Sequence, residues 1–127
     1  MRIILDTHAL IWFTEGDNKL SSKAISAISN TTYKKYVSIA SLWEIVIKSS
    51  KSKLELKQSF AELNHFLSLN QIEVIAIESK HLNTLLTLPH HHGDPFDRLI
   101  IAQAITENLT IVSADRHFEG YAVEIFW

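Results

Sequence analysis

The chain has 127 residues, of which 46 % are apolar and 20 % charged, with a formal net charge of −2; these are ordinary values for one globular domain with a real core. It contains no cysteine, which excludes disulfide bonds and zinc–thiolate sites and suits a cytoplasmic location. No apolar run approaches the ~18 residues that span a membrane. We therefore expect residues 1–127 to form a single domain without a membrane segment, in which any nucleic-acid contact is local because the chain is not basic.

The first half of the chain contains two short apolar runs, residues 3–5 and 36–39, that predict buried strands. Between them, Ser21 or Ser22 is suited to cap a helix with buried apolar residues. Two later pairs have the spacing of a capping box, in which a serine and a glutamate three residues on satisfy the first N–H groups of a helix. These pairs are Ser41 with Glu44, and Ser59 with Glu62.

The second half of the chain continues this alternation. A short leucine-rich helix is expected to stop at Pro89, and Asp94 is suited to cap a helix over residues 96–108 because proline follows it. Three apolar runs predict strands: residues 74–77, 109–112 and 122–126. Strands that alternate with helices pair in parallel through right-handed crossovers. The predicted fold is therefore α/β, a three-layer α/β/α sandwich around a central parallel sheet.

Four acidic residues, Asp6, Glu44, Asp97 and Asp115, follow strands or open helices in this scheme. Taken singly, each has a structural explanation. Glu44 and Asp97 fit the third position of a helix, where a carboxylate accepts a backbone N–H and interacts well with the helix dipole. Asp6 can cap a helix, and Asp115 can be a turn residue. In open α/β sheets, however, ligands bind beyond the carboxyl ends of the strands, so these four side chains are expected to share one pocket.

A shared pocket of carboxylates requires compensation. Two unit charges about 4 Å apart repel by about 4 kcal/mol at an effective dielectric of 20, and several such pairs would rival the whole stability of a domain, about 5–15 kcal/mol. Mg²⁺ or Mn²⁺ is the natural counter-charge for a set of oxygen ligands. Such an ion activates water and stabilises charge on a phosphodiester. The acids therefore indicate metal-dependent chemistry on phosphate esters.

Four stretches of the chain, in this order, resemble a PIN domain and, more narrowly, the VapC-type ribonuclease toxins of prokaryotic toxin–antitoxin pairs. The most specific of them is DPFDRLIIAQA at residues 94–104. The others are Ile4-Leu5-Asp6-Thr7-His8, SIASLWEIVIK at residues 38–48 and IVSADRHF at residues 111–118. The resemblance implies five parallel strands in the order 3-2-1-4-5. It also implies a homodimer, and a small cognate antitoxin that covers the active groove.

Carried over by position, the resemblance makes Asp6, Glu44 and Asp97 the three core acids and Asp115 the fourth. Asp6 and Asp97 are the surest metal ligands among them. Hydroxyl groups at Thr7 and Ser113 are then expected to orient carboxylates or water, although both also fit plain structural roles as a cap and a turn residue. Asp94 belongs to the same signature, where we favour capping over direct ligation.

Several basic residues lie next to these acids in the sequence. Lys48 follows Glu44 by four residues on one helix, so it either forms an ordinary ion pair or contacts a phosphate. Arg98 and Arg116 allow the same phosphate contact. The run His90-His91-His92 is expected to flank the mouth of the cleft, because adjacent loop histidines do not readily face one metal ion.

Together these features predict a divalent-metal-dependent endoribonuclease that uses metal-activated water and no protein nucleophile. Two other functions stay open at this point. A haloacid-dehalogenase-like phosphatase also has an Asp after its first strand, but it needs a second Asp two positions later, where this chain has His8. A non-catalytic receiver or interaction module that binds Mg²⁺ needs a phosphoacceptor after the third strand, where only Glu78 is available.

Overall fold

The computed structural model describes residues 1–127 and is built around a five-stranded sheet. The strand order is β3-β2-β1-β4-β5 and every neighbouring pair is parallel, which confirms the expected topology. The strands are β1 (Arg2–Leu5), β2 (Lys34–Ser38), β3 (Ile72–Ile75), β4 (Thr110–Val112) and β5 (Ile125–Phe126). Parallel sheets of this kind need helices on both faces, because each crossover runs over the sheet.

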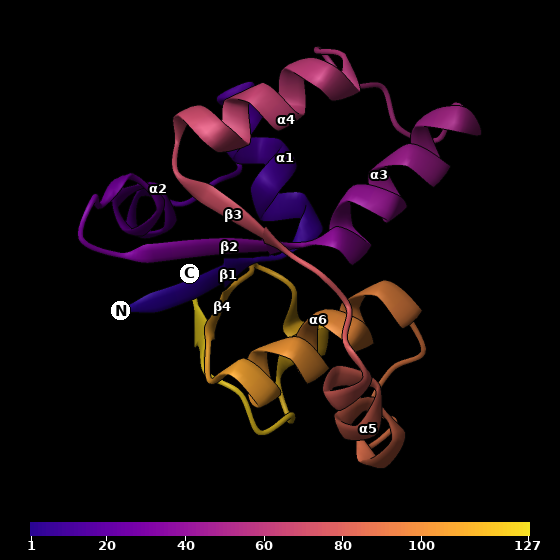
Figure 1. The fold of residues 1–127 in the computed structure, drawn as a ribbon. Helices are drawn as coiled ribbons and strands as arrows, with labels where there is room; N and C mark the ends of the chain where they lie inside the picture. Colours follow the sequence, from indigo (N-terminus) through magenta and orange to yellow (C-terminus); the bar gives the residue numbers. More distant parts are fainter.

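Helices cover the sheet from both sides, so the three-layer sandwich is also confirmed. They are α1 (Thr7–Glu15), α2 (Ser22–Ser29), α3 (Ile39–Ser50), α4 (Phe60–Leu69), α5 (Ser79–Thr87) and α6 (Pro95–Glu107), with a short 3₁₀ helix at Arg116–Phe118. In Figure 1 the first four helices lie on one side of the sheet, and α5 and α6 lie on the other. None of these helices has the length and apolarity that a membrane crossing requires.

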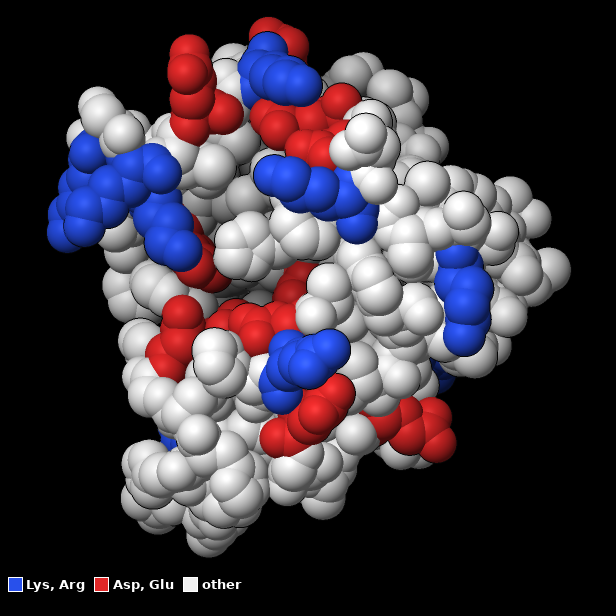
Figure 2. Space-filling model, turned by 180° about the vertical axis from the view of Figure 1, so that it is seen from behind, with Lys and Arg blue, Asp and Glu red and all other residues white.

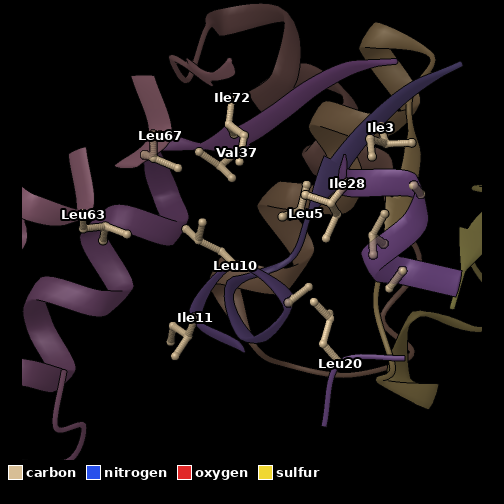
Figure 3. Packing of buried hydrophobic residues seen from close by; sticks show 14 of the residues in the cluster. Ile3, Leu5, Leu10, Ile11, Leu20, Ile28, Val37, Leu63, Leu67 and Ile72 are labelled. Atoms are coloured by element: carbon tan, nitrogen blue, oxygen red, sulfur yellow. The ribbon is translucent and has the colours of Figure 1, made fainter. Parts of the chain in front are cut away.

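The alternation of side chains along β1 divides the core into two clusters. Ile3 and Leu5 pack with apolar residues of α1 to α4, whereas Ile4 packs with residues of α6 on the other face. Figure 3 shows the first cluster, in which Leu10 of α1 and Leu67 of α4 point toward the residues of the sheet. Successive side chains of a strand point to opposite faces, so one continuous apolar run can supply both layers.

Most of the expected helix starts are confirmed. Ser21 caps α2, Ser59 caps α4 and Asp94 caps α6, each by accepting a backbone N–H bond. The capping box at Ser41 was wrong, because α3 begins three residues earlier and is capped by Ser38, whose Oγ accepts from Ala40 N at 3.0 Å. Glu44 therefore lies in the second turn of α3, where it has no capping role.

β1 and β4 differ from their predicted ranges by one residue at one end, whereas β2, β3 and β5 differ by two residues or more at one or both ends. β2 ends at Ser38 because Ile39 already belongs to α3. β3 starts and ends two residues earlier than expected, and β5 is limited to Ile125–Phe126. β5 pairs only with the last two residues of β4, and a short strand at the edge of a sheet has only one neighbour to stabilise it.

Candidate active site

The register of the parallel strands brings distant residues to one edge of the sheet. Leu5 of β1 is level with Val37 of β2 and with Val112 of β4. The next residue of each strand, Asp6, Ser38 and Ser113, therefore lies at the carboxyl end of the sheet. This is the edge at which open α/β sheets bind their ligands.

Asp6 links β1, α1 and the end of β4. Its Oδ1 caps α1 by accepting from Ala9 N at 2.8 Å, and its Oδ2 accepts a short hydrogen bond from Ser113 Oγ, a residue 107 positions away. The side chain is buried. Burial raises the pKa of the Asp6 carboxyl, against the lowering effects of the bonds from Ser113 and Ala9. Asp6 is thus both a helix cap and a buried carboxylate at the centre of the site.

Glu44 is buried in the second turn of α3 and is held by two partners. Its Oε1 accepts from Thr7 Oγ1 at 2.7 Å, and the Thr7 hydroxyl lies 3.0 Å from the Ser41 hydroxyl. Its Oε2 lies 2.6 Å from Lys48 Nζ, so the ion pair considered for Lys48 is present. Thr7 and Lys48 fix the orientation of this carboxylate.

Lys48 also faces the other acids. Its pKa is raised mainly by the hydrogen bond to Glu44, and the negative charges of Asp94 and Asp97 raise it further. The side chain is 40 % exposed, so its ammonium group lies at the surface beside the carboxylates. Lys48 therefore offers positive charge to the site as well as an ion pair to its own helix.

Asp97 lies in the first turn of α6, next to the capping residue. Asp94 Oδ1 accepts from Phe96 N at 2.9 Å and from Asp97 N at 3.1 Å, which is the capping role expected of it. The pKa of Asp97 is raised to about 8, first because the carboxyl is buried and then because Asp94, Asp6, Glu44 and Asp115 are negatively charged. The other three acids singled out in the sequence therefore all act on the charge of Asp97, although the four come from four separate elements.

Asp115 completes the cluster from the loop after β4. Its backbone N–H donates to Ser113 Oγ at 3.0 Å, and its Oδ1 accepts from His117 N at 2.8 Å, so it caps the short 3₁₀ helix. Figure 2 shows acidic side chains gathered around a hollow on one face of the molecule, with Lys and Arg side chains near its rim. A recess with this distribution of charge favours a cation inside and an anion across its opening.

The two arginines proposed as phosphate contacts occupy different environments. Arg98 is buried, and its guanidinium group donates to Pro89 O at 2.7 Å, to Leu88 O at 3.3 Å and to Tyr121 Oη at 3.3 Å. Through these hydrogen bonds Arg98 holds the loop before α6 in place. The buried position of Arg98 therefore favours a structural role over contact with substrate. Arg116 is exposed in the 3₁₀ helix.

One residue at the site received no specific role from the sequence. His92, of the loop between α5 and α6, has its Nε2 3.8 Å from Asp97 Oδ2 and its ring stacked on His117 at 5.6 Å. The histidine run was expected to flank the cleft, and His92 does lie beside the acids. The signal available in the sequence was its proximity to Asp94. Nothing in the sequence pointed to Tyr121, whose hydroxyl oxygen lies 2.9 Å from His92 Nδ1.

A second group of possible metal ligands lies between α5 and α6, away from the strand ends. Ligand atoms of Glu78, His81 and Glu107 all lie within 4.8 Å of one another. These atoms already have partners, because His81 Nδ1 accepts from Glu78 N at 2.9 Å and His81 Nε2 lies 3.0 Å from Glu107 Oε1. Lys80 Nζ is 2.7 Å from the same Glu107 oxygen. We therefore treat this group as a polar connection between the two helices.

Comparisons with known proteins agree with this geometry. The family model for the PIN domain matches residues 3–124. The curated protein Ribonuclease VapC22 of Mycobacterium tuberculosis is 26 % identical over 121 residues, which is 94 % of this chain and 91 % of that protein.

Solved structures of similar fold come from toxin–antitoxin complexes. A chain of VapBC2 from Rickettsia felis, bound to a DNA fragment from their promoter, superposes with a TM-score of 0.76 at 23 % identity and covers 99 % of this chain and 98 % of that chain. A chain of a toxin–antitoxin complex from Klebsiella pneumoniae gives a TM-score of 0.67 at 17 % identity and covers 98 % of this chain and 96 % of that chain. A chain of VapBC-1 from nontypeable Haemophilus influenzae gives a TM-score of 0.66 at 13 % identity and covers 99 % of this chain and 97 % of that chain.

Proposed function

Because the chain belongs to the PIN domain family, we propose that it is a divalent-metal-dependent endoribonuclease and the toxin of a toxin–antitoxin pair. Its curated relative is named a ribonuclease, and its structural neighbours are toxin–antitoxin complexes. The observation that carries the proposal is the convergence of Asp6, Glu44, Asp97 and Asp115 at the carboxyl end of the sheet. We place the activity in the cytosol and treat residues 1–127 as one domain.

The residues present fit a divalent cation. Burial together with neighbouring negative charges raises the pKa of Asp97 to about 8, which is the signature of carboxylates that lack a counter-charge. The donor set is made of carboxylate oxygens, which suits Mg²⁺ or Mn²⁺. Asp6 and Asp97 would hold the ion, with Glu44 and Asp115 completing the set. When bound, the ion supplies the positive charge that activates water and neutralises the phosphodiester.

The remaining residues of the site orient these ligands. Ser113 and Ala9 hold the two oxygens of Asp6, and Thr7 holds Glu44. Side chains whose orientation is already fixed lose little entropy when a ligand binds, which favours a precise site. Lys48 lies beside the acids at the surface, where its ammonium group can bind an RNA phosphate. No nucleophilic side chain is required, since water is the nucleophile.

RNA cleavage tests this proposal directly. The purified protein is expected to cleave RNA with Mg²⁺ or Mn²⁺ and to lose this activity in EDTA. Asp6→Asn and Asp97→Asn remove ligand charge without changing side-chain size and should abolish cleavage. Glu73→Gln is a matched control, because Glu73 is an exposed residue of β3. Full activity in either Asp→Asn variant would overturn the assignment.

The two other functions raised by the sequence are less well supported. A dehalogenase-like phosphatase needs a second Asp at the position of His8, and a receiver needs an acceptor after β3. The comparisons match ribonuclease and toxin–antitoxin proteins instead. A phosphoenzyme trapped on Asp6 would favour the phosphatase. Mn²⁺ binding without any RNA cleavage would favour the receiver or interaction module.

Exposed apolar residues give the protein surfaces for partners. Trp43, the neighbour of Glu44, is 57 % exposed and packs edge-on against Phe96, the neighbour of Asp97, at 5.2 Å between ring centroids. We propose that a small antitoxin covers this surface and blocks the acids. Leu86 of α5 is 82 % exposed and is a candidate for a homodimer contact. Co-expression of the antitoxin should relieve the growth arrest that the wild-type protein causes. Expression of the Asp97→Asn variant alone should cause no arrest.

A further inference from the structure

His92 has a buried nitrogen that nothing in the protein satisfies. The side chain is 11 % exposed, and its Nε2 atom has no hydrogen-bond partner. Asp97 Oδ2 lies 3.8 Å from it, which is too long for a hydrogen bond. Buried polar groups without partners are rare and costly, so this atom calls for a ligand that arrives from outside.

The hydrogen bonds around Tyr121 determine which nitrogen of His92 carries the proton. The backbone N–H groups of His91 and His92 donate to the Tyr121 hydroxyl oxygen at 3.2 and 3.3 Å, and Arg98 Nη1 donates to it at 3.3 Å. These three N–H groups share the two acceptor lone pairs of the hydroxyl oxygen, which leaves only the hydroxyl proton for a further contact. The remaining contact, with His92 Nδ1 at 2.9 Å, is therefore donated by Tyr121.

With Nδ1 acting as acceptor, the proton of the neutral ring lies on Nε2. Nε2–H is thus an unused donor that lies beside the Asp97 carboxylate. A donor is unsuited to metal ligation, which requires a free lone pair on nitrogen, but it is suited to an oxygen anion.

We infer that His92 is a further substrate-binding residue of this site, whose Nε2–H donates a hydrogen bond to a phosphate oxygen of the bound RNA. This inference rests on the proposed function. The carboxylates beside His92 would hold the cation, and the phosphodiester would have to approach that cation to be cleaved. Tyr121 and Arg98 act through His92 as positioning residues. Phosphate contacts of this kind are independent of base sequence.

Three variants separate hydrogen bonding from packing. His92→Leu fills a similar volume without a donor, whereas His92→Gln places an amide N–H near the position of Nε2. Tyr121→Phe removes the hydroxyl that fixes the tautomer. His90→Leu is the control, because His90 is an exposed residue of the same loop. Binding is measured by fluorescence anisotropy with a labelled random-sequence single-stranded RNA in Ca²⁺, and cleavage of the same RNA is measured in Mg²⁺ or Mn²⁺.

A hydrogen bond to a charged group accounts for roughly 10- to 100-fold in affinity. We expect His92→Leu to lower RNA affinity at least about tenfold, with His92→Gln restoring most of it and His90→Leu matching the wild type. ¹⁵N NMR of the free wild-type protein should show the Nε2–H tautomer of His92, and Tyr121→Phe should shift the ring toward the Nδ1–H form.

The outcomes distinguish this inference from the function on which it rests. If the wild type neither binds nor cleaves RNA, both are wrong. If the wild type is active and folded His92→Leu equals it, only the role of His92 is wrong. Equal losses in the Leu and Gln variants would mean that the ring acts by packing, which also overturns the inference. An Nδ1–H tautomer in the wild type would do the same.

Discussion

Replacing Asp97 with asparagine is expected to stabilise the metal-free protein while it abolishes RNA cleavage. The pKa of Asp97 is raised from 3.8 to about 8 in the folded protein, first by burial and then by the neighbouring carboxylates. For an acid with a raised pKa, its contribution to stability is fully present below pH 3.8 and is lost as the pH rises toward 8. Asparagine at position 97 does not ionise, so the variant does not lose this stability as the pH rises.

The size of the effect follows from the pKa shift. Each unit corresponds to about 1.4 kcal/mol, so between pH 3.8 and 7 the loss has an upper bound of about 4 kcal/mol. The Asp97 side chain is 17 % exposed, and solvent screening and relaxation reduce this value. We expect Asp97→Asn to raise the free energy of unfolding by about 2 kcal/mol at pH 7, or the melting temperature by about 6–10 °C.

Urea unfolding in EDTA, monitored by circular dichroism, measures this difference between pH 4 and pH 8. The stability gain should be close to zero near pH 4, increase through neutral pH and level off above pH 8. Glu73→Gln, an exposed acid on β3, should show no comparable pH dependence. If Asp97→Asn were no more stable than the wild type at pH 7, the acids would not repel one another as the structure implies.

Three further predictions concern the metal, the ligands and the loop. Mg²⁺ or Mn²⁺ should raise the melting temperature of the wild type more at pH 8 than at pH 5, because only ionised carboxylates bind it; an equal rise at both pH values would contradict a site at these acids. Thr7→Val removes the hydroxyl that donates to Glu44 at 2.7 Å and should lower cleavage about tenfold or more with little change in RNA affinity; unchanged turnover would remove Thr7 from the site. Arg98→Met leaves the carbonyl groups of Leu88 and Pro89 without their donor and should destabilise the protein by about 1–3 kcal/mol, measured by urea unfolding; a fully stable variant that bound RNA poorly would restore Arg98 as a phosphate contact.

Local patterns were sufficient to predict most of the fold. Apolar runs separated by helical stripes predicted five parallel strands, and Ser21, Ser59 and Asp94 were recognised as caps because a cap depends only on residues within one turn. The failure at Ser41 has a local cause as well. Ser38 and Ser41 are both suitable caps, and the end of β2 at Ser38 selects the earlier one.

The candidate site was predictable only in part. The sequence singled out the four acids because each follows a strand or opens a helix, and parallel strands carry such positions to one edge of the sheet. It offered no way to choose between substrate contact and structural support for Arg98. That choice depends on Tyr121 and on the loop before α6, which approach Arg98 only after the chain has folded.

The sequence by itself determined which residue types were available and on which elements they lie: buried parallel strands, amphipathic helices and carboxylates at strand ends. Only the tertiary structure decided which side chains meet, such as Ser113 with Asp6 across 107 positions, Thr7 with Glu44, and Tyr121 with His92. The physical reason is that hydrogen bonds need donor and acceptor within about 3 Å. Strand register and helix packing set that separation, and neither is encoded in any single segment.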